Sequence, residues 1–380
     1  MNIFITDPHL KGGGQVRYVA NLAGELVQLG HPVTIGCKTG SVLEECAGAA
    51  RCGVHTGFVF RGGLRPNAWR NDLAEARRLI RESKPDVVHV NGSQDHWVFA
   101  AANRMLGRPV CLVRTRHNTY PVHNLLPNRI LNRNWTDYQI VVCEEVRQRL
   151  AKQSAFDPAR MCSIHNGVDA ERFRPDPATR NKARTEFAYA EDEVVCGIAA
   201  RLVPDKGHAF LFRSVAEIKG DFPRLRILVL GQGKLDEELK QLARDLGIGD
   251  TVQFAGFRED MAYCTQAIDI GVQPSIGCDT SSFSLKEQMA AEKPVVASDY
   301  GGLKEIVTDG EEGFVVPTAT VRPLAEALRK LVRDPALRAR MGSAGRRRVI
   351  RDFTIQIFAA KTLDAYRQAR AIHQTRTAGG

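Results

Sequence analysis

The chain has 380 residues, of which 43% are hydrophobic and 25% charged, a composition typical of soluble globular proteins. This length predicts two domains, and no apolar run reaches the ~20 residues that span a bilayer. The first residues lack the pattern of a signal peptide, and the nine cysteines contain no C-x-x-C pair. We therefore expect a cytoplasmic protein with reduced thiols, and exclude a membrane-spanning protein, a disulfide scaffold and a zinc site.

The formal net charge is +10, and the excess of Lys and Arg lies in residues 1–170 and 340–380. A basic surface of this kind suits a polyanionic partner such as an anionic lipid, a phosphorylated glycolipid or a nucleic acid. A charged, solvated surface without such a partner is the alternative. We expect no nucleic-acid binding, because the basic segments lack interleaved aromatic residues and any recognisable binding module.

In chain order, the apolar run 1–7 predicts a first strand, which is followed by Gly12-Gly13-Gly14 and a helical pattern that Gly30 ends. A glycine-rich turn between a strand and a helix lets backbone N–H groups approach an anion at the positive end of the helix dipole. We expect this turn to contact a phosphate, although many turns of this kind bind nothing.

Strands and helices alternate through the rest of the first half. His117 follows the predicted strand 109–115, at the edge where the loops of a parallel sheet meet their ligands. We expect it to point to that edge, and a structural loop histidine is the alternative. The other strands predicted here are 33–37, 86–91, 138–143 and 161–165, the helices are 69–83, 97–106 and 144–152, and 120–131 is expected to be a loop or an irregular helix.

The stretch 173–190 is polar and carries Pro175 and Pro177, so we expect a linker there. A second α/β series follows it, and a long basic helix from about residue 350 to 370 is expected to finish the chain. The strands predicted in this series are 194–199, 225–230, 252–254, 267–272 and 294–297, and the helices are 208–218, 234–246, 260–266, 283–291 and 321–333.

The repeated alternation predicts an α/β protein with two Rossmann-like domains, each built on a parallel sheet. The two domains are expected to face each other across a cleft, with the loops at the carboxyl ends of the strands lining it. We place the first domain at residues 1–170, the second at 171–355, and a C-terminal helix that returns to the first domain at 356–380.

Two basic residues, Arg201 and Lys206, lie in one loop after a predicted strand, and Gly207 follows at the start of the next helix. Two cations at a helix N-terminus suit the two phosphates of a pyrophosphate group. A pair of solvated surface cations is the alternative.

Two acids, Asp279 and Glu287, lie in a loop rich in Ser, Thr and Gly and in the helix that follows it. A loop that folds back onto the helix N-terminus would bring them close together. Carboxylates accept hydrogen bonds from vicinal hydroxyls, such as those of a ribose or a hexose. A helix cap or a surface charge is the alternative for either acid.

Several short motifs follow one another in a fixed order. They are the glycine-rich first loop, Asn166-Gly167-Val168-Asp169 with Arg172-Phe173, Arg201 with Lys206-Gly207, Gly231-x-Gly233, Val252-x-Phe254-x-Gly256-Phe257, Pro274-Ser275, Asp279 with Glu287, and Pro294-Val295-Val296-Ala297 with Gly301-Gly302 and Glu305. In this order they resemble the retaining family 4 glycosyltransferases of GT-B fold. The resemblance covers roughly residues 2–360 and is strongest in the C-terminal half.

The resemblance implies that Arg201 and Lys206 hold the diphosphate of a nucleotide-sugar donor and stabilise its charge as it leaves. It also implies that Asp279 and His117 contact the donor sugar and that Glu287 binds the ribose hydroxyls. The other donor-binding residues that it implies are Gly13, Gly14, Gly231, Gly233, Phe257, Ser282, Phe283 and Ser284. No metal ion and no cofactor is expected, because the two basic side chains supply the positive charge.

The chain departs from the usual motif of this family, which opens with Glu and continues with Gly-Phe-Gly. Asp279 stands in place of the Glu, and Ser282-Phe283-Ser284 stands in place of Gly-Phe-Gly. The carboxylate is shorter by one methylene, and two serines replace flexible glycines. The identity of the donor sugar is the property most affected, and a degenerate, non-catalytic family member is an alternative.

The resemblance implies a retaining glycosyltransferase that moves a sugar from a UDP-, ADP- or GDP-linked donor to a hydroxyl acceptor. The N-terminal domain would bind the acceptor and the C-terminal domain the donor. The basic first half and tail favour an anionic glycan or glycolipid, such as a lipopolysaccharide core or polysaccharide intermediate, at the inner face of a membrane. A nucleotide-sugar epimerase of similar fold and a non-catalytic subunit that binds sugar nucleotides are the alternatives.

Overall fold

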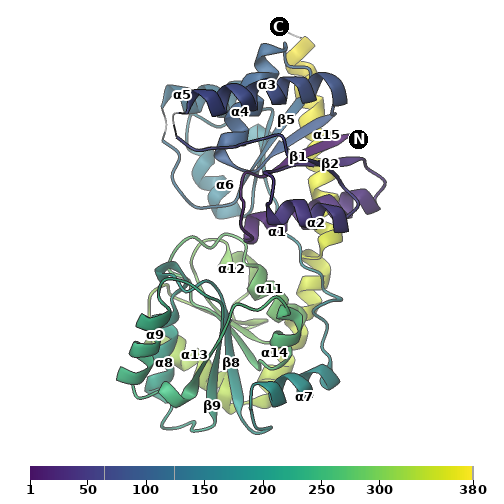
Figure 1. Ribbon diagram of the computed structural model, residues 1–380. Coiled ribbons are helices and arrows are strands. Elements are labelled where there is room, and N and C mark those ends of the chain that lie inside the picture. The colour runs from purple at the N-terminus through teal and green to yellow at the C-terminus, as the bar shows by residue number, and fades with distance from the viewer. Residues whose placement is uncertain (64, 124, 379–380) are drawn as a thin grey trace. The chain divides into compact units, whose positions relative to one another are not determined.

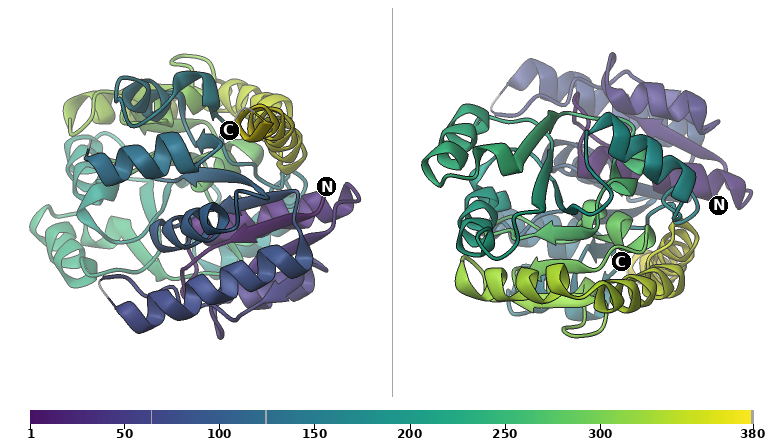
Figure 2. Two further views of the ribbon diagram at one scale, coloured as in Figure 1. Left: turned by 90° about the horizontal axis from the view of Figure 1, so that it is seen from above. Right: turned by 90° about the horizontal axis from the view of Figure 1, so that it is seen from below.

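A computed structural model describes residues 1–63, 65–123 and 125–378 of the chain (Figure 1). The chain folds into two compact units. The first unit consists of residues 1–167 and 355–380, and the second unit of residues 168–354. Each unit has a parallel sheet with helices on both sides (Figure 1, Figure 2), which confirms the prediction of two Rossmann-like α/β domains.

In the described part of the first unit, seven parallel strands follow the order β3-β2-β1-β4-β5-β6-β7. The inner strands are apolar and buried, because helices cover both faces of a parallel sheet. The order reverses between β1 and β4, and such a reversal opens a crevice at the carboxyl ends of the strands. The strands are β1 (Ile3–Thr6), β2 (Val33–Gly36), β3 (Gly53–His55), β4 (Val87–Val90), β5 (Cys111–Arg116), β6 (Tyr138–Val141) and β7 (Met161–Ser163).

The C-terminal helix α15 (Ile355–Ala378), yellow in Figure 1, packs in the first unit against α1 (Gly14–Gln28) and β5. Phe358 and Tyr366 are the large side chains that it buries there. The other helices of this unit are α2 (Val42–Ala49), α3 (Pro66–Ser83), α4 (Ser93–Met105), α5 (Leu126–Arg129) and α6 (Glu144–Ala151), with a π-helical turn at Ile130–Trp135 and a 3-10 turn at Pro158–Arg160. The sequence analysis missed α2 and β3.

In the second unit, all of whose residues are described, six parallel strands follow the order β10-β9-β8-β11-β12-β13, with the reversal between β8 and β11. The strands are β8 (Val194–Ala199), β9 (Leu225–Leu230), β10 (Val252–Gly256), β11 (Ile270–Gln273), β12 (Val295–Ser298) and β13 (Gly313–Val316). The helices are α7 (Pro177–Glu186), α8 (His208–Ile218), α9 (Asp236–Asp245), α10 (Met261–Gln266), α11 (Phe283–Ala290), α12 (Leu303–Ile306), α13 (Arg322–Arg333) and α14 (Pro335–Asp352), with 3-10 turns at Pro204–Lys206 and Gly249–Thr251.

The linker predicted at residues 173–190 is wrong, because this stretch contains α7 and belongs to the second unit. Pro177 occupies the first turn of α7, where proline is tolerated, and the Asp176 side chain caps the helix. The polar residues that suggested a linker bind inside the unit: Arg180 and Arg184 both form ion pairs with Asp269. Two of the charged residues of this stretch therefore belong to a partly buried ion-pair cluster.

The single basic helix predicted at about 350–370 is also wrong, because two helices cover this range. α14 ends in the second unit, and α15 begins in the first. Between them, the Phe353 carbonyl accepts a 2.8 Å hydrogen bond from the Val168 N–H, and Thr354 forms a parallel bridge with Val168. The chain therefore enters and leaves the second unit at adjacent points.

Candidate functional site

The donor-site residues predicted in the second unit lie in loops at the carboxyl ends of neighbouring strands. Arg201 and Lys206 follow β8, and Asp279 follows β11, which pairs with β8. Gly231 and Gly233 follow β9 on the other side of β8. The order of the strands reverses between β8 and β11, so these loops converge at the crevice where α/β sheets bind their ligands.

Lys206 and Asp279 form a direct ion pair at this edge. Lys206 Nζ lies 2.9 Å from Asp279 Oδ2, and only 15% and 6% of the two side chains are exposed. The sequence analysis assigned the lysine to a diphosphate and the acid to a sugar, and did not foresee that the two would touch. The residue predicted to bind the diphosphate and the residue predicted to bind the sugar are therefore partners in one ion pair.

Two further polar side chains complete the environment of Asp279. Gln273 Nε2 donates to Asp279 Oδ2 at 2.8 Å, and Ser275 Oγ donates to the same oxygen at 2.7 Å. Asp279 Oδ1 accepts no hydrogen bond from any residue that the structure describes, so this oxygen can accept one from a ligand hydroxyl. Ser275 was predicted only as part of a motif, and Gln273 was not predicted as a site residue. The one signal for Gln273 in the sequence is that it is a polar residue at the end of a buried strand.

Two glycines allow the loops around the ion pair to pack closely against each other. Gly207, which follows Lys206, has φ +72°, and a Cβ at this position would lie 1.9 Å from the Pro274 carbonyl oxygen. Gly301 has φ +57°, and its Cβ would lie 2.3 Å from the Asp279 carbonyl oxygen. Only glycine allows both the left-handed backbone and this close approach. The Lys206 loop and the Asp279 loop are therefore each held against a neighbouring loop.

Arg201 is exposed, in contrast to Lys206. Its side chain forms no hydrogen bond or ion pair with any residue in the described part of the chain. The guanidinium is thus a cation that is available to solvent or to a ligand, five positions from Lys206 on the same loop. The structure places the two basic residues at one edge but does not bring them to a common partner within the protein.

Glu287 lies in the middle of α11 and is 3% exposed. Ser282 caps this helix, because its Oγ accepts a 3.2 Å hydrogen bond from the Leu285 N–H. Phe283 and Ser284 form the first turn and are half-buried. Ser282, predicted as a donor-binding residue, thus has a structural task that also fixes the start of the helix carrying Glu287.

Lys286 is a buried cation that the sequence analysis missed. Its side chain is fully buried, and Nζ lies 2.9 Å from Ser281 Oγ and 5.7 and 5.4 Å from the ring centres of Phe283 and Phe353. A lysine inside an apparently ordinary helix gives no signal in the sequence. Its contacts tie the loop that follows Asp279 to α11.

Gly231 and Gly233 are explained by packing between loops. A Cβ on Gly231, which has φ +145°, would lie 2.0 Å from the Ala200 carbonyl oxygen, and one on Gly233 would lie 2.3 Å from the Leu202 carbonyl oxygen. Both glycines therefore let the loop after β9 approach the loop that carries Arg201. Phe257, which the resemblance implies as another donor-binding residue, is 62% exposed.

In the first unit, the predicted Gly13 and Gly14 lie between β1 and α1. Gly13 is the N-cap of α1, and both glycines are exposed. Apart from Gly13 itself and its neighbours in the chain, no atom of the described residues lies within 4 Å of a Cβ built on Gly13. The space above the first turn of α1 is therefore open to a ligand.

His117 follows β5 at the same edge of the first sheet and is half-buried. Its Nε2 lies 2.9 Å from Asn91 Oδ1, and its ring packs edge-on against Tyr18 at 4.6 Å. Asn91 Nδ2 donates to the Thr6 carbonyl, so Oδ1 is the acceptor and His117 Nε2 carries the proton. Burial, with nearby Arg114 and His89, holds the pKa of His117 well below its ordinary value, so the ring is neutral at neutral pH.

Behind His117 lies a buried chain of polar groups that the sequence analysis missed. His89 Nδ1 lies 2.6 Å from Tyr366 Oη, and His89 Nε2 lies 2.6 Å from Thr115 Oγ1. Thr115 Oγ1 in turn lies 3.2 Å from Tyr18 Oη. This chain links α15, β4, β5 and α1, and it fixes Tyr18, on which His117 rests.

The predicted site residues therefore form two groups, one in each unit. The second unit holds Arg201, Lys206, Asp279 and Glu287, and the first unit holds the glycine turn and His117. Among the described residues, no group of three His, Cys, Asp or Glu side chains could hold a metal ion. In the same part of the chain, no helix combines the length and the apolar character needed to cross a membrane.

Two family profiles match the chain. The one described as Glycosyltransferase Family 4 matches residues 12–172, and the one described as Glycosyl transferases group 1 matches residues 179–348. The GDP-mannose-dependent alpha-(1-6)-phosphatidylinositol monomannoside mannosyltransferase of Mycobacterium tuberculosis is 30% identical over 375 residues, which cover 93% of this chain and 94% of the relative.

Solved structures share the fold over almost the whole chain. A glycosyltransferase from Rickettsia africae superposes with a TM-score of 0.86 and 21% identity, covering 97% of this chain and 98% of that one. Anabaena HepE in complex with UDP-glucose superposes with a TM-score of 0.82 and 22% identity, covering 96% and 99%. The match extends over both units.

Proposed function

The chain belongs to family 4 of the glycosyltransferases, and from this premise we propose that it transfers a sugar, with retention, from a nucleoside-diphosphate donor to a hydroxyl acceptor. The observation that carries the proposal is the ion pair of Lys206 and Asp279 at the carboxyl ends of β8 and β11. A cation beside a carboxylate can hold the leaving diphosphate and a hydroxyl of the adjacent sugar at the same time.

Lys206 and Arg201 act on the diphosphate in this proposal. As the bond between the anomeric carbon and the phosphate oxygen breaks, negative charge grows on the diphosphate, and a fixed cation stabilises that charge more than it stabilises the bound donor. Asp279 already balances the Lys206 ammonium. A diphosphate that binds Lys206 must therefore share it with Asp279 or displace this carboxylate.

Asp279 Oδ1, Glu287 and His117 act on hydroxyl groups. Asp279 Oδ1 accepts from the donor sugar, and Glu287 from the ribose. His117 is neutral at neutral pH, so it contributes hydrogen bonds without adding a charge beside the reacting carbon. The acceptor hydroxyl attacks from the face that the diphosphate leaves and transfers its proton to the departing phosphate oxygen, which conserves the anomeric configuration.

For the donor and the acceptor, the proposal names a chemical class and not a single compound. The Mycobacterium relative is named as GDP-mannose-dependent, and the Anabaena structure contains UDP-glucose, so these two sugar nucleotides are the first donors to test. The relative acts on a phosphatidylinositol mannoside, and this chain carries a net charge of +10. We propose an anionic glycan or glycolipid acceptor at the inner face of a membrane, with a lipopolysaccharide core as one example.

We propose that transfer needs no divalent metal, because Lys206 and Arg201 place positive charge where a metal ion would otherwise bind the diphosphate. The cations belong to a loop that Gly207 fixes against Pro274, so the charge is in position before the donor arrives. Activity should therefore persist in a chelator.

The experiment is an incubation with each sugar nucleotide, with and without an extract of anionic glycolipids, followed by NMR analysis of the product. The expected result is an acceptor-dependent glycoside with the anomeric configuration of the donor, and its loss in Glu287→Ala. An isomerised sugar nucleotide formed without acceptor would identify an epimerase. Sugar-nucleotide binding without any turnover would identify a non-catalytic subunit, and either result would overturn the proposal.

A further inference from the structure

A second strongly basic feature of the chain lies at the opposite edge of the first sheet from His117. A pocket of about 400 Å³ opens at the amino ends of β5 and β6. Its lining contains Asn134, Trp135 and the five arginines Arg104, Arg108, Arg133, Arg160 and Arg376. We call it the arginine pocket. α4, the π-helical turn and α15 supply residues to it, so segments far apart in the sequence build one site.

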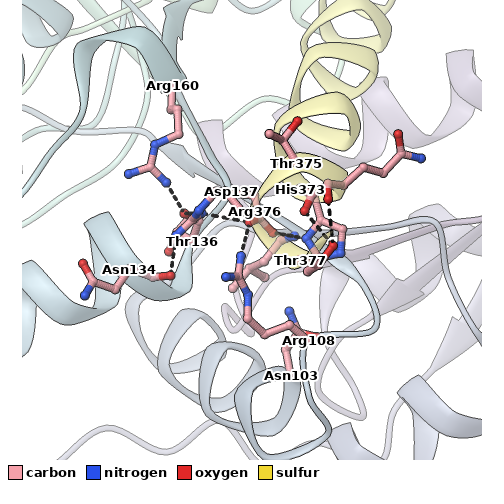
Figure 3. Close-up of polar contacts among 12 residues, drawn as sticks. Asn103, Arg108, Asn134, Thr136, Asp137, Arg160, His373, Thr375, Arg376 and Thr377 are labelled. Carbon is pink, nitrogen blue, oxygen red and sulfur yellow. Dashed lines mark hydrogen bonds and ion pairs between the residues drawn. The ribbon is translucent and has the colours of Figure 1, made fainter. Parts of the chain in front are cut away.

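A single buried carboxylate lies beneath the arginine pocket (Figure 3). Asp137 is fully buried, and its Oδ1 accepts from Arg108 Nη2 at 2.6 Å and from Arg376 Nη1 at 2.9 Å. Its Oδ2 accepts from the Leu112 N–H and lies 2.9 Å from His373 Nδ1. One negative charge is therefore shared between two arginines and a histidine.

Backbone carbonyls hold the guanidinium groups in place without adding negative charge. Arg376 and Arg160 both donate to the Thr136 carbonyl, at 2.9 and 3.2 Å, and both donate to the Arg133 carbonyl, at 3.2 and 2.7 Å. Two cations are thus fixed on the same pair of oxygens. Fixed guanidinium groups bind an anion with little further loss of side-chain entropy.

The positive charge of the arginine pocket exceeds the negative charge near it. Besides Asp137, only Asp157 among the described residues pairs with one of the five arginines, through Arg160 Nε at 3.0 Å. Arg104 is exposed, and its side chain makes no hydrogen bond or ion pair with any described residue. Burial and the neighbouring Arg160 lower the pKa of Arg376, although Asp137 raises it, so its positive charge is incompletely balanced.

We propose that the arginine pocket binds a phosphate group, either of a soluble phosphate ester or of an anionic lipid headgroup. The guanidinium fork of Arg104, whose side chain pairs with no described residue, matches the oxygens of phosphate. Arg376 and Arg160 already donate to protein oxygens, so they contribute fixed positive charge, which favours an anion of more than one charge. The volume admits a pyrophosphate or a small phosphorylated headgroup. The bound phosphate supplies the negative charge that Asp137 alone does not, and it links α15 to α4.

The test compares Arg104→Glu with Arg340→Glu, which makes the same charge change at an exposed arginine of the second unit. Inorganic pyrophosphate is titrated by calorimetry in a Lys206→Ala background, which weakens the proposed diphosphate site of the second unit. Sedimentation with phosphatidylcholine vesicles, with and without 30% phosphatidylglycerol, measures binding to lipid. Arg104→Gln, which removes the charge without reversing it, serves as a milder second variant.

We expect Arg104→Glu to weaken at least one probe about tenfold or more, Arg104→Gln to weaken it less, and Arg340→Glu to leave it within about twofold. Loss confined to pyrophosphate identifies a soluble phosphate as the ligand, and loss confined to phosphatidylglycerol vesicles identifies a lipid headgroup. The proposal is overturned if neither probe binds, or if the variants at positions 104 and 340 weaken binding equally.

Discussion

Lys206 Nζ and Asp279 Oδ2, 73 residues apart in the sequence, lie 2.9 Å apart at the carboxyl edge of the second sheet. A buried ion pair offsets the loss of hydration only when hydrogen bonds complete it, and Gln273 and Ser275 supply them on the same oxygen. The group is therefore preorganised, and any ligand that takes up Lys206 changes the surroundings of Asp279. In the proposed mechanism, this contact couples binding of the diphosphate to binding of the sugar.

Asp279→Asn is predicted to have opposite effects on the binding of the diphosphate and on the transfer of the sugar. The amide keeps the shape of the side chain but releases Lys206, so the affinity for a nucleoside diphosphate should rise about five- to tenfold. Transfer should fall about 100-fold or more in kcat, because the sugar loses its charged acceptor. Calorimetry and steady-state kinetics measure the two effects.

Asp279→Glu is the matched control for this variant, because it keeps the charge and restores the residue that is usual in the family motif. Its affinity for the nucleoside diphosphate should stay within about threefold of the unmodified protein. If Asp279→Asn weakens the nucleoside diphosphate and lowers turnover by the same factor, the two roles are not coupled in the way that the ion pair implies.

Gly207→Ala is predicted to lower the free energy of unfolding far more than Gly247→Ala does. Both glycines have a positive φ, +72° and +65°, so both substitutions introduce backbone strain of about 1 kcal/mol. Only at Gly207 would the added Cβ clash with a carbonyl, 1.9 Å away on Pro274, whereas nothing lies within 4 Å at Gly247. Denaturant unfolding should show a loss of about 3 kcal/mol or more at Gly207. Equal losses at the two positions would contradict the proposed locking of the Lys206 loop.

Asp269→Ala tests whether α7 is part of the second unit. Asp269 accepts from Arg180 at 2.5 Å, from Arg184 at 3.0 Å and from the Val195 N–H at 2.8 Å. Its removal leaves two partly buried guanidinium groups without their acid, which should lower the free energy of unfolding by about 3–5 kcal/mol. The control is Glu191→Ala, at an exposed acid close by. If residues 173–190 were a flexible linker, Asp269→Ala and Glu191→Ala would both lower the free energy of unfolding only slightly, and this result would contradict the placement of α7 in the second unit.

Acid should destabilise the first unit through His89. Burial lowers the pKa of this histidine to about 3, whereas it is about 6.5 in the unfolded chain. Between about pH 3 and pH 6.5, His89 is therefore protonated in the unfolded chain but neutral in the folded protein. Its contribution to the free energy of unfolding is fully present above about pH 6.5 and is lost progressively as the pH falls below that value. From pH 7 to pH 5 the loss from His89 should be about 2 kcal/mol.

Urea unfolding at pH 7 and pH 5 measures this loss. His89→Asn should reduce the difference between pH 7 and pH 5 by about 2 kcal/mol, whatever its effect on stability at pH 7, and should leave the share of other buried histidines such as His117. His123→Asn, at an exposed loop histidine, should leave the difference unchanged. An unaltered pH dependence in His89→Asn would show that proton binding at another group causes the loss.

The parts of the candidate site that could be predicted from the sequence are those that short-range patterns encode. Arg201, Lys206 and Gly207 follow a buried strand within one loop, and Asp279 stands in a polar loop after another. The contact between Lys206 and Asp279 could not be predicted, because the pairing of β8 with β11 brings these loops together. The parallel α/β architecture followed in the same way from the alternation of apolar runs.

The residues that were missed gave little or no local signal. Lys286 reads as a surface lysine of a helix but is fully buried against Phe283 and Phe353. From the sequence, Gln273 is expected to be a polar residue at the end of a strand, and its hydrogen bond to Asp279 could not be predicted. The stretch with α7 was misread because proline and charge suggest a linker, whereas the arginines there are paired with an acid about 85 residues later in the chain. Tertiary pairing decides such cases, and sequence patterns do not record it.

The most direct test of the account is the affinity of Lys206→Ala for a nucleoside diphosphate and for the corresponding nucleoside. The base is chosen first by titrating UDP, GDP and ADP into the unmodified protein. Calorimetry should then show that the variant loses about 30-fold or more in affinity for the diphosphate, while binding of the nucleoside is unchanged. If the diphosphate binds equally well with and without the Lys206 ammonium, this side chain does not hold the leaving group and the proposed mechanism is wrong.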